Sequence, residues 1–199
     1  ETVRDGRLLP LLLPMSEVAG RLAAGAAAQY LLGTEGGPGV LLGGTPGVAP
    51  ARVVVIGGGN VGTQAAQISV GLGAEVTILE GYGPRVRQLS DQFGSSARVL
   101  TSNPANIRRE IENADVIIGS VLVPGAKAPH VISREDLKHM KENTLLIDVA
   151  IDQGGCFETS RPTTYADPIF EVDGIRHYCV ANMPGAVPRS STIALTDAT

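Results

Sequence analysis

The sequence predicts an α/β protein with a doubly wound parallel sheet that carries helices on both faces. Two observations support this prediction: short apolar strands alternate with helix-like segments, and the apolar residues are mostly aliphatic. Of the 199 residues, 43% are hydrophobic but only 4% are aromatic, as is typical of strands that are buried on both sides. A chain of this length is sufficient for one sizeable domain.

The first predicted element is a helix over Ser16–Leu32, a segment rich in Ala and Leu. Ser16 can cap its start and Gly33 follows its end, as at many helix termini. A glycine-rich connector, 33–50, separates this helix from the sheet. Strands and helices then alternate as strand Arg52–Ile56, helix Asn60–Leu72, strand Glu75–Leu79, helix Arg85–Phe93, strand Arg98–Leu100, helix Ala105–Asn113 and strand Asp115–Gly119.

The second half of the chain is less regular. Ser133 and Asp136 have the spacing of a capping box, which predicts that a helix starts there. The remaining predicted elements are strand Thr144–Val149, a strand near Arg176–Val180 and a helix that opens around Ser190. We therefore divide the chain into a linker segment with its helix (1–33), a sheet domain (34–188) and the start of a further helix (189–199).

Charge and cysteine usage restrict the function. The net charge of −4 and the pI of about 5.4 argue against a nucleic-acid or anionic-membrane partner, which would require a basic surface. Cys156 and Cys179 form no CxxC motif and no metal-ligand spacing, so we predict no metal site and a reducing, cytoplasmic location. No apolar run reaches the roughly 18 residues that a membrane span needs.

The N-terminal segment Arg7–Met15 resembles the apolar part of a signal peptide. Its two prolines, the acidic start of the chain and the lack of a cleavage-like site argue against that interpretation. The chain begins with Glu1, so we expect that it was processed or belongs to a longer protein.

A glycine-rich turn follows the predicted strand Arg52–Ile56. Gly57, Gly59 and Gly62 form a G-x-G-x-x-G motif between this strand and a helix, the arrangement of a Rossmann-type dinucleotide-binding fold. The first glycine allows the tight turn, the second lets the backbone approach a pyrophosphate, and the third lets helix and strand pack closely. The helix N-terminus then offers free N–H groups to the anion.

An acidic residue supports this interpretation. Glu80 ends the next strand, 18 residues after Gly62, where a carboxylate can accept hydrogen bonds from the adenosine ribose hydroxyls. Because a carboxylate repels a 2′-phosphate, the sequence favours NAD over NADP, although the nearby Arg85 weakens that preference. The alternative is that Glu80 is a surface acid at a strand end.

Four longer motifs carry a more specific resemblance. They are PMSEVAGRLA (Pro14–Ala23), GSVLVPGAKAP (Gly119–Pro129), DVAIDQGGCFETSRPTTY (Asp148–Tyr165) and CVANMPGAVPRSST (Cys179–Thr192). With them, the chain resembles the L-alanine dehydrogenases of the alanine dehydrogenase/pyridine nucleotide transhydrogenase family along its whole length. The resemblance implies a two-domain enzyme that uses NAD to interconvert L-alanine with pyruvate and ammonia. This chain resembles the NAD-binding half, with a linker helix before it and a truncated return helix after it.

The resemblance also implies which residues contact NAD. Ser16 would start the linker helix near the cofactor, and EGYGPR (80–85) departs from the family, which usually has Asp at this strand end. The residues expected on the adenosine and pyrophosphate side are Gly57, Gly59, Asn60, Val61, Gly62, Glu80, Arg85 and Ser102. Those expected on the nicotinamide side are Val121, Leu122, Val149, Ala150, Ile151, Arg161, Val180, Ala181, Asn182 and Met183.

Asp152 follows the strand Thr144–Val149, at the strand end where ligands bind in an open parallel sheet. The resemblance implies that Asp152 is the catalytic acid at the nicotinamide end, where it would orient a water or the cationic amine and relay its proton. The alternative is that Asp152 only closes a loop. Gly154 and Gly155 would let the backbone turn closely past the cofactor, and Cys156 is expected to be a buried, inert thiol.

The histidines, Lys127 and Arg189 are not expected to take part in catalysis. His130, His139 and His177 match none of the family's catalytic motifs, so we expect surface or packing histidines. Lys127 lies in a Pro/Gly-rich segment and is expected to be a surface charge. Arg189 precedes the last predicted helix and would help to position a domain contact.

Three functions remain open at this point. An alanine dehydrogenase polypeptide would reduce the imine formed from pyruvate and ammonia, or deaminate L-alanine in the reverse direction. Alternatively, the chain is a catalytically inactive NAD-binding module, or the NAD(H)-binding component of a proton-translocating transhydrogenase. The run DQGGCFETSRPTTY argues against the transhydrogenase. The resemblance also implies a homo-oligomer, a hexamer.

Overall fold

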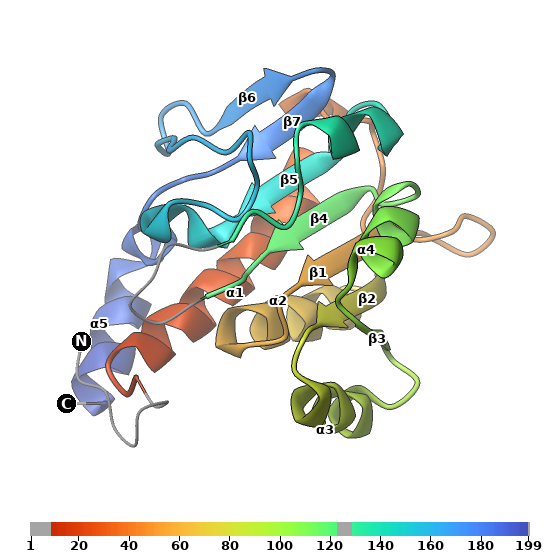
Figure 1. Cartoon of the computed structure of the whole chain (residues 1–199). Helices are drawn as coiled ribbons and strands as arrows, with labels where there is room; N and C mark the ends of the chain where they lie inside the picture. The colour runs from red at the N-terminus through yellow and green to blue at the C-terminus, as the bar shows by residue number, and fades with distance from the viewer. Residues whose placement is uncertain (1–8, 123–128, 199) are drawn as a thin grey trace.

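A computed structural model describes residues 9–122 and 129–198. Within this part of the chain, seven strands form one sheet in the order β3-β2-β1-β4-β5-β7-β6 (Figure 1). All neighbouring strands are parallel except β6 and β7, which are antiparallel. The strands are β1 Arg52–Ile56, β2 Glu75–Glu80, β3 Arg98–Thr101, β4 Val116–Gly119, β5 Leu145–Asp148, β6 Ile169–Val172 and β7 Ile175–Tyr178.

The described α-helices are α1 Leu12–Tyr30, α2 Asn60–Gly71, α3 Gly83–Phe93, α4 Pro104–Ile111 and α5 Pro188–Asp197. Four short 3₁₀ turns complete the secondary structure of the described residues: η1 Gly33–Glu35, η2 Glu135–His139, η3 Val149–Gln153 and η4 Met183–Ala186. The element α5 packs beside α1 (Figure 1), so the last helix is adjacent to the first in space.

The sheet is buried on both faces, as β1 demonstrates. Val53 and Val55 pack in the hydrophobic cluster to which α1, α2 and α3 contribute. Val54 and Ile56 point to the opposite face, where the cluster includes residues of α4 and η2. Successive side chains of a strand alternate between its two faces, so a run of β-branched residues serves both layers. The prediction of a doubly wound α/β fold with a helix before it is confirmed.

The helix α1 begins earlier than predicted. It starts at Leu12, so Ser16 lies inside the helix and does not cap it; Leu11 stands at the cap position without a side-chain hydrogen bond. Pro14 is tolerated in this first turn because the first four N–H groups of a helix have no partner within the helix. The prediction that Ser16 starts the helix was therefore wrong, but Ser16 is buried.

The segment after Ser133 was also predicted incorrectly. The capping box is present, because the Ser133 backbone N–H donates to Asp136 Oδ2 (2.9 Å) and the Asp136 N–H lies 3.3 Å from Ser133 Oγ. The chain then forms the short 3₁₀ turn η2 rather than an α-helix. A capping box satisfies N–H groups at the start of a turn but does not determine how far the helix continues.

The strand β6 was missed altogether. It pairs with β7 through a two-residue turn at Asp173 and Gly174, whose φ angles of 52° and 78° are both left-handed. An Asp-Gly pair between apolar residues is a strong hairpin signal, because both central residues of such a turn need positive φ. The sequence VDGI, at 172–175, contains this hairpin signal.

Candidate functional site

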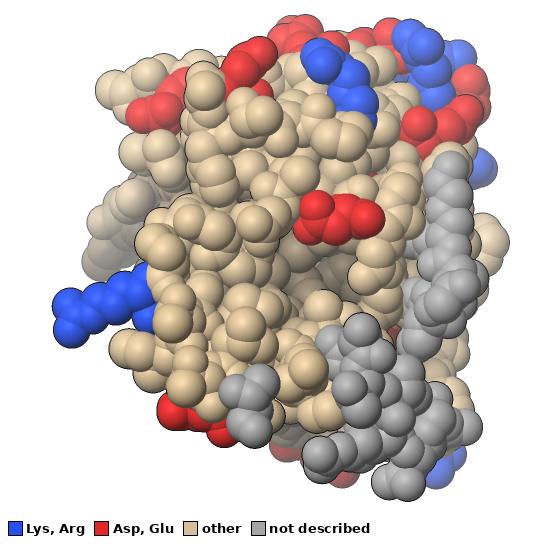
Figure 2. All heavy atoms as spheres, turned by 90° about the vertical axis from the view of Figure 1, so that its left-hand side faces the viewer, with Lys and Arg blue, Asp and Glu red and all other residues tan. Residues whose placement is uncertain are grey.

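A groove lies at the carboxyl ends of the strands, where the strand order reverses between β1 and β4. Open α/β sheets bind ligands at such a point. Figure 2 views the molecule from this side and shows a mostly uncharged face that is hollowed near its centre, beside an acidic side chain. The groove combines a cavity of about 420 Å³ with one of about 200 Å³, and both are lined by Ser16, Val61, Ser120, Val121 and Leu122.

The three glycines of the motif have distinct structural roles. Gly57 has a φ of 99°, and a Cβ there would lie 2.8 Å from the carbonyl oxygen of Ser120. A Cβ at Gly62 would overlap the carbonyl oxygen of Gly57, so helix α2 approaches the turn closely only with glycine there. A Cβ at Gly59 would meet no atom within 4 Å. Gly59 therefore faces open space and leaves room for a ligand against the backbone.

The first turn of α2 faces the same cavity. Gly59 is its N-cap residue, so no side chain there can accept a hydrogen bond from the helix N–H groups. Asn60 and Val61, the first two residues of the helix, line the larger cavity. Free N–H groups and the positive end of a helix dipole bind anions, so this is the position at which a phosphate group fits.

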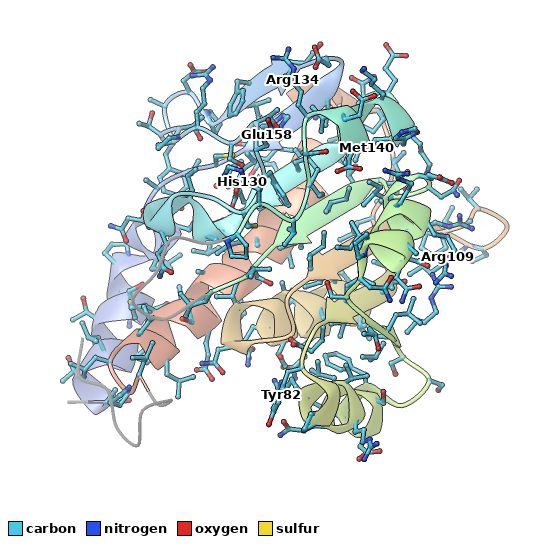
Figure 3. The ribbon with its side chains drawn as sticks, viewed as in Figure 1. Tyr82, Arg109, His130, Arg134, Met140 and Glu158 are labelled. Carbon is cyan, nitrogen blue, oxygen red and sulfur yellow. The ribbon has the colours of Figure 1, made fainter. Side chains whose placement is uncertain are left out.

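Glu80 links the end of β2 to the glycine turn. Its Oε2 accepts a hydrogen bond from the Gly58 N–H at 2.7 Å, and its Oε1 accepts one from the Tyr82 N–H, also at 2.7 Å. Figure 3 shows Tyr82 at the start of α3. A carboxylate has about four acceptor positions, so two remain after these bonds. Glu80 and Ser102 both line the larger cavity.

Arg85 contacts the turn rather than the cavity. Its Nε donates to the Gly58 carbonyl oxygen at 2.8 Å, and one terminal nitrogen donates to Thr63 Oγ1 at 2.8 Å. It is not among the residues that line either cavity. Its expected role at the ribose stays a prediction, whereas its bonds show that it braces the glycine turn against α2.

The smaller cavity contains the predicted acid. Asp152 lies in η3 and is exposed, and both of its carboxylate oxygens lie 3.1 Å from the Asn182 N–H, which donates to them. Asn182 has a left-handed φ of 50°, which turns its backbone toward this carboxylate. Val149, Ala150 and Asn182 line the cavity with Asp152. A carboxylate at the mouth of an apolar cavity can orient a water or a cationic group inside it.

Comparison with known proteins identifies the family. The model for the "Alanine dehydrogenase/PNT, C-terminal domain" matches residues 23–199. The chain belongs to the alanine dehydrogenase/PNT family. Alanine dehydrogenase of Bacillus subtilis (strain 168) is 56% identical over 200 residues, which cover 100% of this chain and 53% of that protein. Alanine dehydrogenase of Halomonas elongata is 57% identical over 191 residues, which cover 96% of this chain and 52% of that protein.

This family member therefore spans about half the length of the curated relatives that it matches. A solved L-alanine dehydrogenase superposes with a TM-score of 0.95 at 48% identity, over 98% of this chain and 54% of that one. A transhydrogenase from Sinorhizobium meliloti superposes with a TM-score of 0.78 at 26% identity, over 94% of this chain and 53% of that one. In both measures the chain is more similar to the dehydrogenase.

Some residues that the resemblance to this family assigned to the cofactor lie outside the groove lining. Ile151 packs in a small cluster with Phe170 and Cys179, and the Arg161 guanidinium lies 4.2 Å from the centre of the Phe170 ring. Gly62, Val180 and Met183 are buried, whereas Ala181 is exposed but lines neither cavity. These five residues and Arg161 have no position on the groove surface, and their cofactor contacts stay predictions.

Sequence reasoning missed two residues at the strand ends of this alanine dehydrogenase/PNT-family domain. Ser120 follows β4; its hydroxyl donates to the carbonyl oxygens of Gly57 (2.8 Å) and Ile56 (3.0 Å), so it holds the glycine turn. Asp148 is the last residue of β5 and is fully buried. The apolar run LLID ends on this acid, which was the available signal.

The remaining reactive side chains are not among the residues that line the two cavities. Cys156 and Cys179 are free, buried thiols, and burial raises both pKa values, that of Cys179 to about 12. His177 is fully buried, whereas His130 and His139 are exposed. The predictions of an inert Cys156 and of packing or surface histidines agree with these positions.

Two further sequence predictions concern Lys127 and Arg189. Lys127 lies outside the described residues. Arg189 is exposed in the first turn of α5 rather than before the helix. Among residues 9–122 and 129–198, no group of three or more His, Cys, Asp or Glu side chains could hold a metal ion, and no helix is long and apolar enough to cross a membrane.

Proposed function

We propose that this chain is the NAD(H)-binding half of an alanine dehydrogenase, which interconverts L-alanine with pyruvate and ammonia. The observation that carries the proposal is the cavity that unites the open backbone at Gly59, the first turn of α2 and the carboxylate of Glu80. The identities of 56% and 57% with named alanine dehydrogenases support the choice of reaction.

The donor and acceptor groups fit a dinucleotide. The pyrophosphate would lie against Gly59 and the N–H groups of Asn60 and Val61, because that end of α2 has room and free donors. Glu80 would use its two remaining acceptor positions for the adenosine ribose hydroxyls, beside Ser102. The negative charge of Glu80 favours NAD(H) over NADP(H), since a 2′-phosphate would be repelled there.

The smaller cavity would receive the nicotinamide end. When bound, the nicotinamide ring accepts or donates the hydride. Val121, Leu122 and Val149 supply apolar surface around that position, which limits the access of water. Asp152 would orient the amine or a water and accept its proton. These roles, and that of Ser16 at the junction of the two cavities, are part of the proposal.

The substrate-binding half would come from the part of the relatives that this chain does not match. We therefore expect the chain alone to bind NAD(H) without turning over L-alanine. Assembly as a homohexamer and a cytoplasmic location also belong to this proposal; the two free, buried thiols are consistent with a reducing compartment.

Parallel titrations of this chain with NADH and NADPH, followed by nicotinamide fluorescence, test the cofactor assignment. The sequence contains no Trp, so the usual overlapping protein signal is absent. Saturable NADH binding with much weaker NADPH binding is expected, and equal affinity for both would contradict the role of Glu80. The complete polypeptide, with a substrate-binding half, should then form NADH when L-alanine and NAD are supplied. No alanine-dependent NADH would overturn the proposed reaction.

A further inference from the structure

Asp148 is a fully buried carboxylate at the end of β5, and the proposed function does not use it directly. Its Oδ1 accepts a hydrogen bond from the Ala150 N–H at 3.1 Å. Its Oδ2 accepts bonds from the Cys156 N–H (2.9 Å), the Phe157 N–H (3.3 Å) and the Ser160 hydroxyl (2.5 Å). The Cys156 thiol also donates to Oδ1, at 3.5 Å. One side chain therefore accepts hydrogen bonds from five donors that come from separate parts of the following segment.

These donors lie on both sides of η3, the turn that carries Asp152. The Ala150 N–H belongs to the start of the turn, and the other four donors belong to the segment that returns after Gly154 and Gly155. Both glycines have left-handed φ angles, 95° and 76°. A Cβ at Gly155 would lie 2.9 Å from Asp148 Oδ2, so the carboxylate fills the space inside the returning chain.

The segment that returns to this carboxylate packs closely against the neighbouring strand β4. Gly119 of the neighbouring strand provides the space for the returning segment, because a Cβ there would overlap Cys156 Sγ. The five groups that donate to Asp148 are neutral, and burial raises the pKa of this carboxyl while the Ser160 hydroxyl, the backbone N–H groups and the Cys156 thiol lower it. A buried charge without a cation is costly, so its retention requires that these bonds be made together.

We propose that Asp148 is a positioning residue for Asp152: its carboxylate ties both sides of η3 so that Asp152 stays at the mouth of the smaller cavity. This proposal rests on the proposed function, since Asp152 is the catalytic group through which Asp148 acts. An asparagine cannot replace it. The NH₂ group of an asparagine would replace one of the two oxygens. It would then face at least one backbone N–H group, and two donors cannot form a hydrogen bond with each other.

The test uses the complete enzyme with Asp148→Asn. The expected result is a fall in kcat of at least about tenfold, because misplacing a catalytic group by about 1 Å can cost a factor of 100. The Kd of NADH should change less than about twofold, because most cofactor affinity would come from the glycine turn and Glu80. In addition, hydrogen exchange of the amides in 149–157 should become faster, whatever the reaction proves to be.

The matched control is Glu110→Gln, which removes the charge of another buried acid. Glu110 lies on α4 and pairs with Arg98 and Arg109, at the edge of the sheet away from the groove (Figure 3 labels Arg109). This variant should lose stability but retain kcat and the exchange rates of 149–157. If Asp148→Asn behaves like Glu110→Gln in these two measurements, the proposal is wrong.

Ser160→Ala keeps the test decisive if Asp148→Asn does not fold. This variant removes one donor and leaves the acid, so it should lower kcat less but in the same direction, with the Kd of NADH unchanged. An unchanged kcat together with unchanged exchange of 149–157 would overturn the proposal. A complete wild-type enzyme without alanine-dependent activity would instead refute the proposed function, and the exchange measurement would still decide whether Asp148 fixes the turn.

Discussion

The carboxylate of Glu80 accepts a hydrogen bond from the Gly58 N–H at 2.7 Å, so the end of β2 and the glycine turn after β1 are joined directly. A second bond, from the Tyr82 N–H to the other carboxylate oxygen, fixes the same side chain. The acid is thus oriented by the backbone before any ligand arrives. Preorganisation of this kind reduces the entropy lost on binding.

Glu80→Gln should weaken NADH binding by about tenfold or more, since hydrogen bonds to charged groups contribute about 1.5–3 kcal/mol. The amide would also present a donor to either the Gly58 or the Tyr82 N–H, and the loss of charge should bring the NADPH affinity closer to that of NADH. Fluorescence titration measures both. Glu75→Gln, at the exposed start of the same strand, should change neither affinity.

Gly59→Ala and Gly62→Ala should separate binding from folding. A methyl group at Gly59 enters open space, so the fold should be retained while NADH binding falls about tenfold or more by loss of the close backbone approach. A methyl group at Gly62 overlaps the Gly57 carbonyl oxygen, and overpacking costs about 1–3 kcal/mol of stability. Thermal unfolding and NADH titration of both variants check this; equal loss of stability would refute the distinction.

Asp152→Asn should lower kcat of the complete enzyme about 100-fold or more, the range of general acid–base catalysis. The Kd of NADH should change little, because one amide oxygen can still accept the Asn182 N–H. Asp91→Asn, an exposed acid on α3, is the control and should leave kcat unchanged. An Asp152→Asn enzyme with near-normal kcat would leave only the loop-closing role for this residue.

The buried His177 predicts how stability depends on pH. Its Nδ1 lies 3.0 Å from the Ile175 carbonyl oxygen, which only accepts, so Nδ1 donates and Nε2 accepts from the Thr159 hydroxyl at 2.7 Å. Burial lowers the pKa of His177, with a smaller lowering by the Arg161 charge. As the pH decreases, His177 is therefore protonated in the unfolded chain, near pH 6.5, before it is protonated in the folded protein. The free energy of unfolding should fall as the pH decreases through and below that value.

Denaturant titrations between pH 7.5 and 5.5 measure this effect. The decrease should become smaller in His177→Gln, which keeps a donor and an acceptor without titrating. It should persist in His139→Gln, where the replaced histidine is exposed. An identical pH dependence in wild type and His177→Gln would show that this histidine is not responsible.

Cys156 and Cys179 should resist thiol reagents in the native protein. Burial is the largest cause of both raised pKa values, and the nearby Asp148 charge raises them further. The reactive thiolate is therefore scarce at neutral pH. Labelling at pH 8 should be slow for both residues until the chain is unfolded, and prompt labelling of the native chain would contradict these positions.

Local patterns were sufficient for most of the sheet. The strand β1 was predicted with its observed bounds, Arg52–Ile56. A run of β-branched residues that ends at a glycine motif strongly favours a strand with that end. The groove residues near that motif were predictable for the same reason. The start of α1 was not, since the cap at Leu11 carries no side-chain signal, whereas Ser16 is a residue type that often caps helices.

Asp148 shows why other parts of the site could not be predicted. The sequence places two acids, Asp148 and Asp152, four residues apart after an apolar run, and the more loop-like one received the functional interpretation. Only the tertiary fold returns the Cys156 and Phe157 N–H groups to the first acid. Such contacts depend on two left-handed glycines and on the space above Gly119, which spacing alone does not encode.

The helix α1 packs closely against the start of α2, directly after the glycine turn. A Cβ at Gly20 would overlap the Val61 carbonyl oxygen and lie 2.9 Å from Gln64 Cβ, so no side chain separates α1 from the first turn of α2. Close-packed contacts of this kind transmit displacement instead of absorbing it. A tilt of α1 imposed from its N-terminal end would therefore move the first turn of α2 with it. Helix α1 is thus mechanically coupled to the turn that we propose binds the pyrophosphate, and Gly20 is a point of close contact between them.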